Sequence, residues 1–275
     1  SFIIMCAIIE KIQKEVPIMS TNENKGKKAE VTALQAISAE DRKDWISLAF
    51  VQAGICVCVP AFLLGALLAE AMPIWPAIIS GSLGYLIVVV GMVATGMIGC
   101  DLGLASCTCC QAGFGKSGAR FIVSTIFAVN MIGWFGIQNG VCGEAFSNAM
   151  LAMTGWDIPV VVSNTIWGII MLLTAVYGVH ALEKLDKISI PLLMIIMCYG
   201  IFLAFKVYGT GNLNDEGTVQ SMSFMSGVAL SFNFTAVGTI TGPDYTRFQK
   251  SRKDTVKSVF YGVFPMGVIT LIMGI

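Results

Sequence analysis

The hydrophobic positions of the chain fall into long apolar runs, and the polar stretches between them hold most of the charged residues. The hydrocarbon core of a bilayer is about 30 Å thick, so a helix that spans it needs roughly 20 mainly apolar residues. Seven runs meet this length, and they predict membrane-spanning helices at 45–69, 74–99, 120–147, 157–179, 188–208, 222–243 and 256–275. The pattern therefore predicts an all-α, polytopic membrane protein.

The composition agrees with this prediction and excludes several other classes of protein. The chain is 56% hydrophobic and 12% charged, with a mean hydropathy of +0.78, whereas about 25% of the residues of a soluble domain are charged. Such a chain also holds too much apolar mass to be intrinsically disordered. The 17 basic residues balance 17 acidic ones, so the excess of positive charge that is typical of nucleic-acid binding is missing.

The nine cysteines do not indicate a disulfide scaffold or a metal site. Most lie in the apolar runs, where Cys behaves as a small hydrophobic residue. Cys107, Cys109 and Cys110 cluster in a short loop, but their spacing differs from the C-x-x-C pair of zinc sites. With His180 as the only histidine, a zinc site or a Ser–His triad lacks partners. We expect reduced cysteines, no resident cofactor and no enzyme active site.

Lysine and arginine predict the orientation, because they are enriched in loops on the cytoplasmic side. All of the 17 except Lys206 belong to the N-terminal stretch or to the loops after the second, fourth and sixth runs; the loop after the fourth run carries Lys184 and Lys187. We therefore expect a multi-pass protein of the cell membrane (plasma or inner membrane) with a cytoplasmic N-terminus. The same pattern places Asp244 and Arg247 at the cytoplasmic end of the sixth helix, outside a substrate site.

The chain divides into a polar N-terminal part and a membrane part. We expect residues 1–43 to form a cytoplasmic tail, in which residues 1–18 are an upstream extension, because Met19 opens a stretch that is typical of a protein start. Residues 44–275 form the transmembrane domain. Its last run ends without a charged cap, so we expect a chain truncated after the seventh helix.

Glycine and proline interrupt the first and sixth runs. Gly54 and Pro60 lie within the first run, and Gly238, Gly242 and Pro243 lie within the sixth. Proline removes a helical hydrogen bond and glycine tolerates unusual dihedrals, so we predict breaks at 54–60 and at 234–242. Either proline alone is compatible with a simple kink. Interruptions in both helices indicate a transporter with a five-plus-five inverted repeat.

The third run carries a candidate binding pair. Trp134 and Gln138 are four residues apart and therefore share one helical face, while Phe135 is expected to face away from them. An indole beside a carboxamide suits a planar heterocycle, which stacks on the ring and forms hydrogen bonds to the amide. Glu144 follows nearer the outer end. It is either a proton-linked carboxyl group or, as we prefer, a helix-end residue in a vestibule.

With these motifs in the same order, the chain resembles the nucleobase–cation symporter 1 family from about Asp44 to Ile275. The resemblance is carried by WFGIQ at 134–138, by PDYTRF at 243–248 and by the loop DLGLASCTCCQAGFGKSGARF at 101–121. It implies a LeuT-like inverted-repeat fold of about twelve helices, of which this chain supplies the first seven. It also implies a symporter that imports cytosine, a purine, hydantoin, allantoin or a related heterocycle, driven by Na⁺ or H⁺, and we expect it to be a monomer.

The resemblance also assigns roles to residues. It implies that Trp134 stacks on the substrate, that Gln138 forms a hydrogen bond to it, and that helix 1 carbonyl groups contribute to a cation site. These carry over as substrate-binding Trp134, Gln138, Cys58, Val59, Phe234 and Thr235, and as cation-binding Gly54 and Val57. The chain departs from the family at Thr235, where many relatives have an aromatic residue. An eighth helix, beyond this sequence, would complete both sites.

Three other interpretations remain open from the sequence. One is a seven-helix receptor or sensor, although the predicted topology is the reverse of the usual receptor arrangement. Another is a membrane-embedded enzyme, for which Glu144 is the only acidic group at membrane depth. The third is a truncated, non-functional fragment of a transporter.

Overall fold

The structure is a computed structural model, and it describes residues 35–176, 179–209 and 221–275. The described part is helical apart from loops and one isolated bridge between Lys43 and Gln249. A short 3-10 helix, Ala39–Asp41, and a short π-helix, Ala119–Val123, accompany eleven α-helices. These are α2 Trp45–Cys56, α3 Val59–Ala71, α4 Ile74–Leu102, α5 Ser106–Cys109, α6 Gln111–Gly118, α7 Ser124–Thr154, α8 Val160–Val176, α9 Val179–Tyr208, α10 Phe224–Thr235, α11 Val237–Thr246 and α12 Arg252–Gly274. The expected upstream extension 1–18 and most of the expected tail lie outside the described residues.

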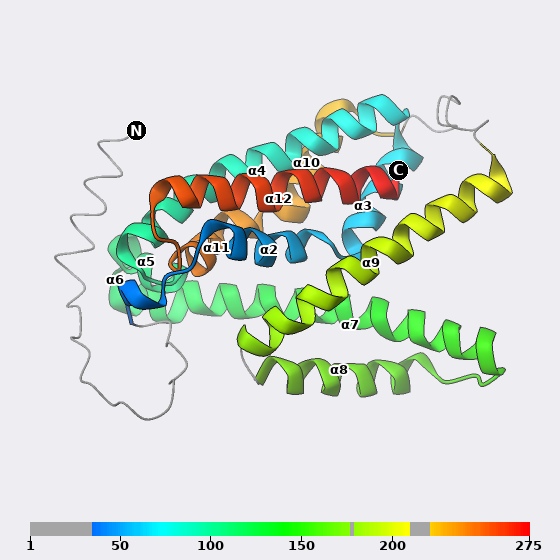
Figure 1. Cartoon of the computed structure of the whole chain (residues 1–275), viewed down its shortest axis with the longest axis horizontal. Helices are drawn as coiled ribbons and strands as arrows, with labels where there is room; N and C mark the ends of the chain where they lie inside the picture. Colours follow the sequence, from blue (N-terminus) through cyan, green and yellow to red (C-terminus); the bar gives the residue numbers. More distant parts are fainter. Residues whose placement is uncertain (1–34, 177–178, 210–220) are drawn as a thin grey trace.

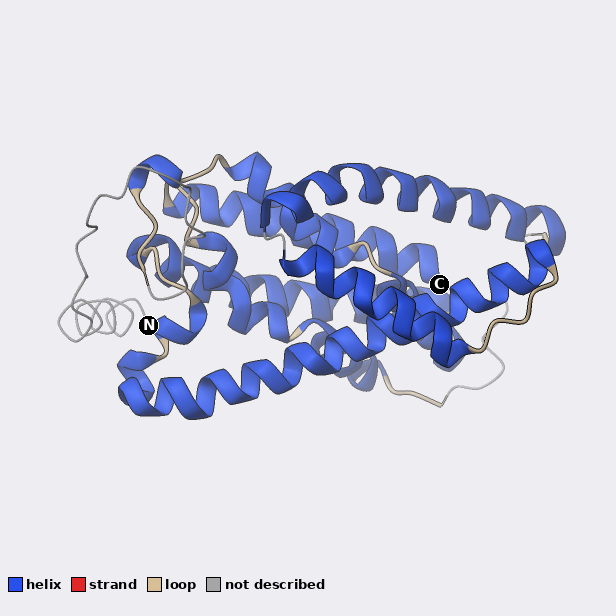
Figure 2. Ribbon diagram, turned by 90° about the horizontal axis from the view of Figure 1, so that it is seen from below, coloured by secondary structure: helices blue, strands red, loops and turns tan. Residues whose placement is uncertain are grey.

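Each of the seven predicted runs forms helix. Four helical segments in the described residues are long and apolar enough to cross a membrane, and α2 with α3 makes a fifth, bent span. α8 and α9 contain the shorter apolar stretches Val160–Leu173 and Pro191–Val207. The polytopic all-α prediction is confirmed, and Figure 2 shows the helices running along the long axis with most loops at its two ends.

Two expected loops are wrong. Lys184 and Lys187 lie within α9 instead of in a loop after the fourth helix. The stretch 101–121, expected as a loop, folds into α5, α6 and a turn that continues into α7. In α9 the polar residues interrupt the hydropathy without ending the helix. In 101–121 the chain leaves α4 at Gly103, whose φ is +66°, and then forms the two short helices.

Six helices form one unit, which we call the bundle: α2, α3, α4, α10, α11 and α12. α10, α11 and α12 lie along α4, and α12 also packs on α2 and α3. Glycine permits the close approach: a Cβ atom at Gly99 would lie 2.5 Å from the Cα atom of Pro243 in α11. Hydroxyl groups add hydrogen bonds between helices, from Ser231 to the Gly81 carbonyl and from Thr246 to the Gly96 carbonyl, each 2.7 Å long. Small residues and such bonds are what bind helices together in a membrane, where water exclusion contributes little.

α7 and α8 form a second unit, which we call the arm. Ser163 of α8 donates to the Gly143 carbonyl of α7 at 2.8 Å, and Asn139 of α7 donates to the Asn164 carbonyl at 3.1 Å. The arm touches the bundle much less than the bundle helices touch one another. In Figure 1 the arm lies below the bundle, and α9 runs obliquely from the level of α8 to that of the bundle.

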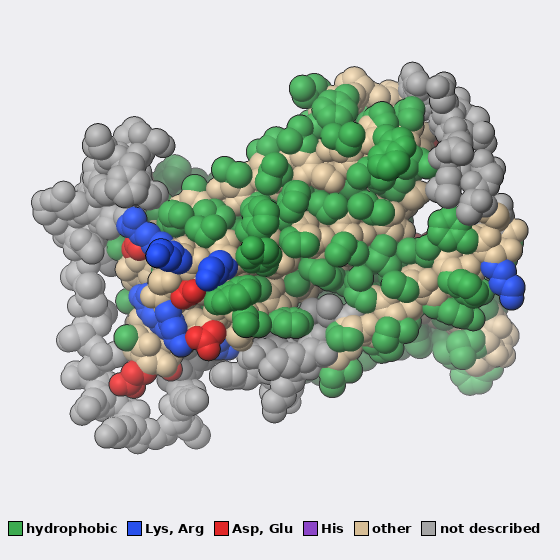
Figure 3. Space-filling model, turned by 45° about the horizontal axis from the view of Figure 1, so that its top comes forward, with side chains coloured by type: hydrophobic (Ala, Val, Ile, Leu, Met, Phe, Trp, Pro, Cys, Tyr) green, Lys and Arg blue, Asp and Glu red, His purple; other side chains and the backbone are tan. Residues whose placement is uncertain are grey.

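The surface fits a membrane environment. Large apolar side chains are exposed along the flanks of the helices, for example Trp75, Val90 and Ile132. Figure 3 shows a flank covered by hydrophobic side chains, with most charged side chains gathered at one end of the molecule. A soluble protein rarely exposes such a large contiguous apolar area.

We call this end, built from residues 37–44, 101–103 and 247–253, the charged end. Arg252 holds Asp101 through two guanidinium nitrogens, with its Nη2 2.6 Å from the carboxylate. Arg42 donates to the Gln249 carbonyl at 2.9 Å, and the Ile37 amide donates to the Gly103 carbonyl at 3.0 Å. The packed part of the chain thus includes residues 37–43, on the tail side of the boundary expected at residue 44.

The first predicted helix break is confirmed. α2 ends at Cys56, α3 begins at Val59, and the two are bent by 55°. Val57 leaves the helical region with φ −89° and ψ 78°. Because Pro60 has no N–H group, the carbonyl of Cys56 loses its usual helical partner.

The second predicted break is wrong in extent. α10 and α11 are separated only at Ala236, whose φ of −54° and ψ of −32° stay helical, and together they form one continuous span. Pro243 frees the carbonyl of Thr239, four residues earlier. The Thr95 hydroxyl of α4 donates to that carbonyl at 2.6 Å. A neighbouring helix therefore supplies the missing donor, and the backbone does not need to unwind.

This repair predicts a thermodynamic coupling between Thr95 and Pro243. Thr95→Val leaves the Thr239 carbonyl without a donor, and we expect a loss of about 1–3 kcal/mol of stability. In a Pro243→Ala background, the new N–H group bonds the same carbonyl, so the cost of Thr95→Val should shrink. Melting temperatures of the four proteins in detergent measure this coupling. An equal cost of Thr95→Val in both backgrounds would contradict the proposed repair.

Candidate functional site

A cavity of about 370 Å³ lies between α7 of the arm and the bundle. α2, α4, α7, α10, α11 and α12 contribute its walls, together with the break after α2. The lining is predominantly apolar with a few polar side chains. Its volume falls within the range of small-molecule sites, which is about 300–1,000 Å³.

Two aromatic rings meet at the cavity. Trp134 of α7 and Phe234 of α10 both line it, with ring centroids 5.3 Å apart and planes at 81°. Gln138, one turn after Trp134, also lines it. The structure thus brings together Trp134, Gln138 and Phe234 from helices that are far apart in the sequence.

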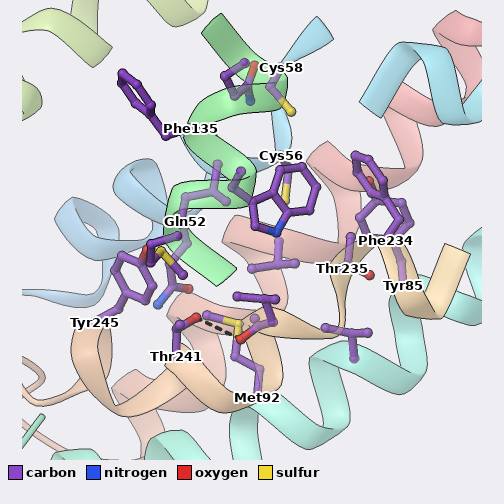
Figure 4. Close-up of a pocket in the computed structure, with 18 residues that line it drawn as sticks. Gln52, Cys56, Cys58, Tyr85, Met92, Phe135, Phe234, Thr235, Thr241 and Tyr245 are labelled. Carbon is purple, nitrogen blue, oxygen red and sulfur yellow. Dashed lines mark hydrogen bonds between the residues drawn. The ribbon is translucent and has the colours of Figure 1, made fainter. Parts of the chain in front are cut away.

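Phe135 was expected to face away from this pair, and it nevertheless borders the cavity. Figure 4 shows its ring at the margin of the site. Adjacent helical residues are only about 100° apart. Because the loosely attached arm presents a broad face of α7 to the cavity, both residues border it.

The break between α2 and α3 brings some of the predicted residues to the cavity and not others. Cys58 lines it and interacts with the Gln138 side chain. Val59, the next residue, is 40% exposed and lies outside the lining, because the chain turns into α3 at this point. Gly54 and Val57 also lie outside the lining. Their carbonyls belong to the end of α2, where the last carbonyl groups of a helix lack helical donors.

The wall from α10 contains the predicted pair Phe234 and Thr235. Phe234 is the aromatic residue that meets Trp134. The Thr235 hydroxyl donates to the Ser231 carbonyl of its own helix at 3.0 Å. Thr235 therefore presents a small polar side chain where many relatives are expected to have a ring.

Several lining residues escaped the sequence reasoning. They are polar or polarizable residues on the bundle side: Gln52, Tyr85, Met92, Thr241 and Tyr245. Figure 4 shows all five around the cavity. Gln52 carried a detectable signal, because a polar residue within a membrane-spanning helix is costly and is a functional candidate by default.

Asp244 and Arg247 lie outside the cavity lining, at the end of α11, as predicted. The Asp244 carboxylate accepts the backbone N–H of Ser106 at 2.9 Å. The Arg247 guanidinium lies 4.9 Å from the centroid of the Phe248 ring. The Asp244 bond ties the end of α11 to the start of α5, which is a structural role.

The three clustered cysteines lie in and next to α5, beside Asp244. Burial, followed by the neighbouring Cys110 and Asp244, raises the pKa of the Cys109 thiol to about 12. Burial also raises the pKa of Cys107 and of Cys110 above its usual value. A protonated thiol is a poor nucleophile and metal ligand, and the described residues contain no group of three or more His, Cys, Asp or Glu side chains placed for a metal.

Comparison with known proteins supports a transport role. Residues 37–275 match the family described as permeases for cytosine/purines, uracil, thiamine and allantoin. The chain is 27% identical to the cytosine permease of Escherichia coli K12 over 237 residues, which cover 85% of this chain and 54% of that protein. It is 25% identical to the purine-uracil permease NCS1 of Arabidopsis thaliana, covering 80% of this chain and 41% of that one. The allantoin permease of Bacillus subtilis is 23% identical, with 82% and 50% covered.

A solved structure shows the same fold. Mhp1, a nucleobase-cation-symport-1 family transporter in a closed conformation with bromovinylhydantoin bound, superposes with a TM-score of 0.77 at 18% identity. The match covers 87% of this chain and 56% of Mhp1. The transporter fold expected from the sequence is confirmed over this part. The chain spans about half the length of the relatives it matches.

Proposed function

Because the chain belongs to the family of permeases for cytosine/purines, uracil, thiamine and allantoin, we propose that its protein is a symporter that imports a nucleobase or a related heterocycle. Membership of this permease family places the chain among transport proteins and not among enzymes. Since the chain spans only part of its relatives, transport is proposed for the protein in its complete reading frame. We place that protein in the cell membrane as a monomer with a cytoplasmic N-terminus.

The observation that carries this proposal is the cavity with Trp134 and Phe234 at one wall and Gln138 beside them. A planar base stacks on an aromatic face, and its edge groups form hydrogen bonds to a carboxamide. Phe234 meets Trp134 edge to face, so it closes one side of the indole. In this proposal Cys58 and Thr235 border the bound ring. Val59 lies outside the cavity, so it would contact the substrate only after a movement of α3.

For the coupling ion we favour Na⁺ over H⁺. The described lining contains no carboxylate and no histidine that would take up a proton near neutral pH. The break after α2, in contrast, frees carbonyl oxygens at Gly54 and Val57, and oxygen donors suit a hard cation. In transporters with broken helices, unwound carbonyls of this kind hold the coupling ion.

Uptake measurements test the substrate class. We expect cells that express the complete protein, in a strain without its own base permeases, to take up at least one of cytosine, uracil, a purine, hydantoin or allantoin with saturable kinetics. Labelled substrates offered one at a time, with vector-only cells as control, identify it. Failure to take up any of them in correctly inserted protein would overturn the proposed substrate class.

Proteoliposomes test the coupling ion. An inward Na⁺ gradient should drive accumulation of the substrate, and replacement of Na⁺ by choline should abolish it. A proton ionophore should leave Na⁺-driven uptake unchanged when the membrane potential is clamped. Accumulation driven by a pH gradient without Na⁺ would instead show proton coupling, and the assignment of Gly54 and Val57 would then be wrong.

Trp134 provides the sharpest test of the site. Stacking of a base on an aromatic ring is worth roughly 1–3 kcal/mol, so Trp134→Ala should weaken substrate affinity about 5- to 150-fold. Trp134→Phe keeps an aromatic face and should lose less. Trp156→Ala is the matched control, because Trp156 is 71% exposed and outside the cavity. Equal effects of Trp134→Ala and Trp156→Ala on affinity would show that Trp134 only packs.

A further inference from the structure

Gln52 of α2 is a buried polar side chain without a partner. It is fully buried, and neither its Oε1 nor its Nε2 atom has a hydrogen-bond partner in the described structure. It also lines the cavity. Figure 4 shows Gln52 beside Tyr245, on the α11 side of the site.

The surroundings of Gln52 do not satisfy its carboxamide. One turn away in its own helix lie the apolar Leu48 and the thiol of Cys56, both buried. The hydroxyl of Thr241, which borders the same part of the cavity, already donates to the Val237 carbonyl at 3.0 Å. A buried carboxamide that forms no hydrogen bonds is costly, and an unsatisfied group of this kind in a folded protein calls for an explanation.

The cavity itself offers the explanation. A carboxamide presents two donor hydrogens and an acceptor oxygen. It therefore matches a ring edge on which an N–H group stands next to a carbonyl oxygen or next to a ring nitrogen, as in lactams and amidines. Along the chain, Gln52 precedes the break after α2, whereas Cys58, the neighbour of Gln138, follows it. The two glutamines thus approach the cavity from different helices and at different places.

We propose that Gln52 is a second hydrogen-bonding contact of the substrate, an inference that rests on the proposed function. Its carboxamide pairs with a lactam or amidine edge of the ring that Gln138 does not hold. Trp134 and Phe234 bind the ring by its face and therefore accept many planar rings. Two carboxamides at different places restrict binding to rings with polar groups on two edges. Gln52 is thereby a specificity-determining residue on the bundle side of the cavity.

Gln52→Leu keeps the approximate size of the side chain and removes its polar groups. The edge of the substrate that Gln52 holds would then be left unpaired, so we expect the affinity for the transported base to fall about 5- to 150-fold. The melting temperature of the ligand-free protein should stay the same or rise, because the variant removes a buried unsatisfied group. Gln138→Leu should cause a comparable loss of affinity.

Gln249→Leu is the matched control. Gln249 is also fully buried with both side-chain polar atoms unpartnered, but it belongs to the charged end and lies outside the cavity. Its replacement should leave substrate affinity unchanged, whatever it does to the melting temperature.

The measurement uses the complete purified protein, with labelled cytosine, uracil, a purine, hydantoin and allantoin as separate probes in equilibrium binding, and melting temperatures with and without each probe. Wild-type protein that binds none of them would overturn the proposed function together with this inference. Wild-type binding with unchanged affinity in Gln52→Leu overturns the inference alone. A lower melting temperature of Gln52→Leu without ligand, with affinity changed no more than in Gln249→Leu, assigns Gln52 a structural role and also overturns it.

Discussion

The membrane requires that backbone polar groups be satisfied within the protein, and two prolines decide where this chain meets the requirement and where it does not. Pro243 frees the carbonyl of Thr239 in α11, and the Thr95 hydroxyl of the neighbouring α4 donates a hydrogen bond to it. Pro60 instead follows a real gap, where the chain leaves the helix at Val57 and bends by 55°. One interruption is repaired and the other is kept open. The position of Cys58 at the cavity and the carbonyl groups left without helical donors both depend on the open one.

The second feature that shapes the site is the unequal attachment of its two walls. Within the bundle, small residues and hydroxyl-to-carbonyl bonds hold α4, α10, α11 and α12 at close range. The arm is internally bonded but touches the bundle only lightly. Trp134 and Gln138 therefore belong to one unit, and Phe234 and Gln52 to the other. A ligand between them would bridge two units that few other contacts connect in the described residues.

Sequence reasoning predicted the parts of this arrangement that are local. Hydropathy located the long apolar helices but not α5, α6 or the polar start of α9. The positions of Gly54 and Pro60 located the first break, because a proline acts on the carbonyl four residues earlier in its own helix. The spacing of Trp134 and Gln138 placed both on one face.

The extent of the sixth-helix break was not predictable, since Thr95, which prevents it, lies in another helix. Nor was the position of Phe135, because helical spacing gives the angle between two side chains but not the width of the space they border. Val59 and Gln52 illustrate the same gap, since the direction of the chain after a 55° bend and the partners of a buried amide are decided by tertiary packing.

The charged end adds a constraint on movement. Arg252 joins the start of α12 to Asp101 at the end of α4, and Arg42 joins the segment before α2 to the stretch after α11. The ends of the helices that form the bundle are thus held together where the chain is most polar, and Asp244 links α11 to α5 nearby. The opposite ends of these helices have no comparable set of ion pairs in the described residues. Charge-assisted bonds are stronger than neutral ones, so movement of these bundle helices relative to one another is most restricted at the charged end. The arm, in contrast, is joined to the bundle by few contacts in the described residues, so its position is the less restrained of the two.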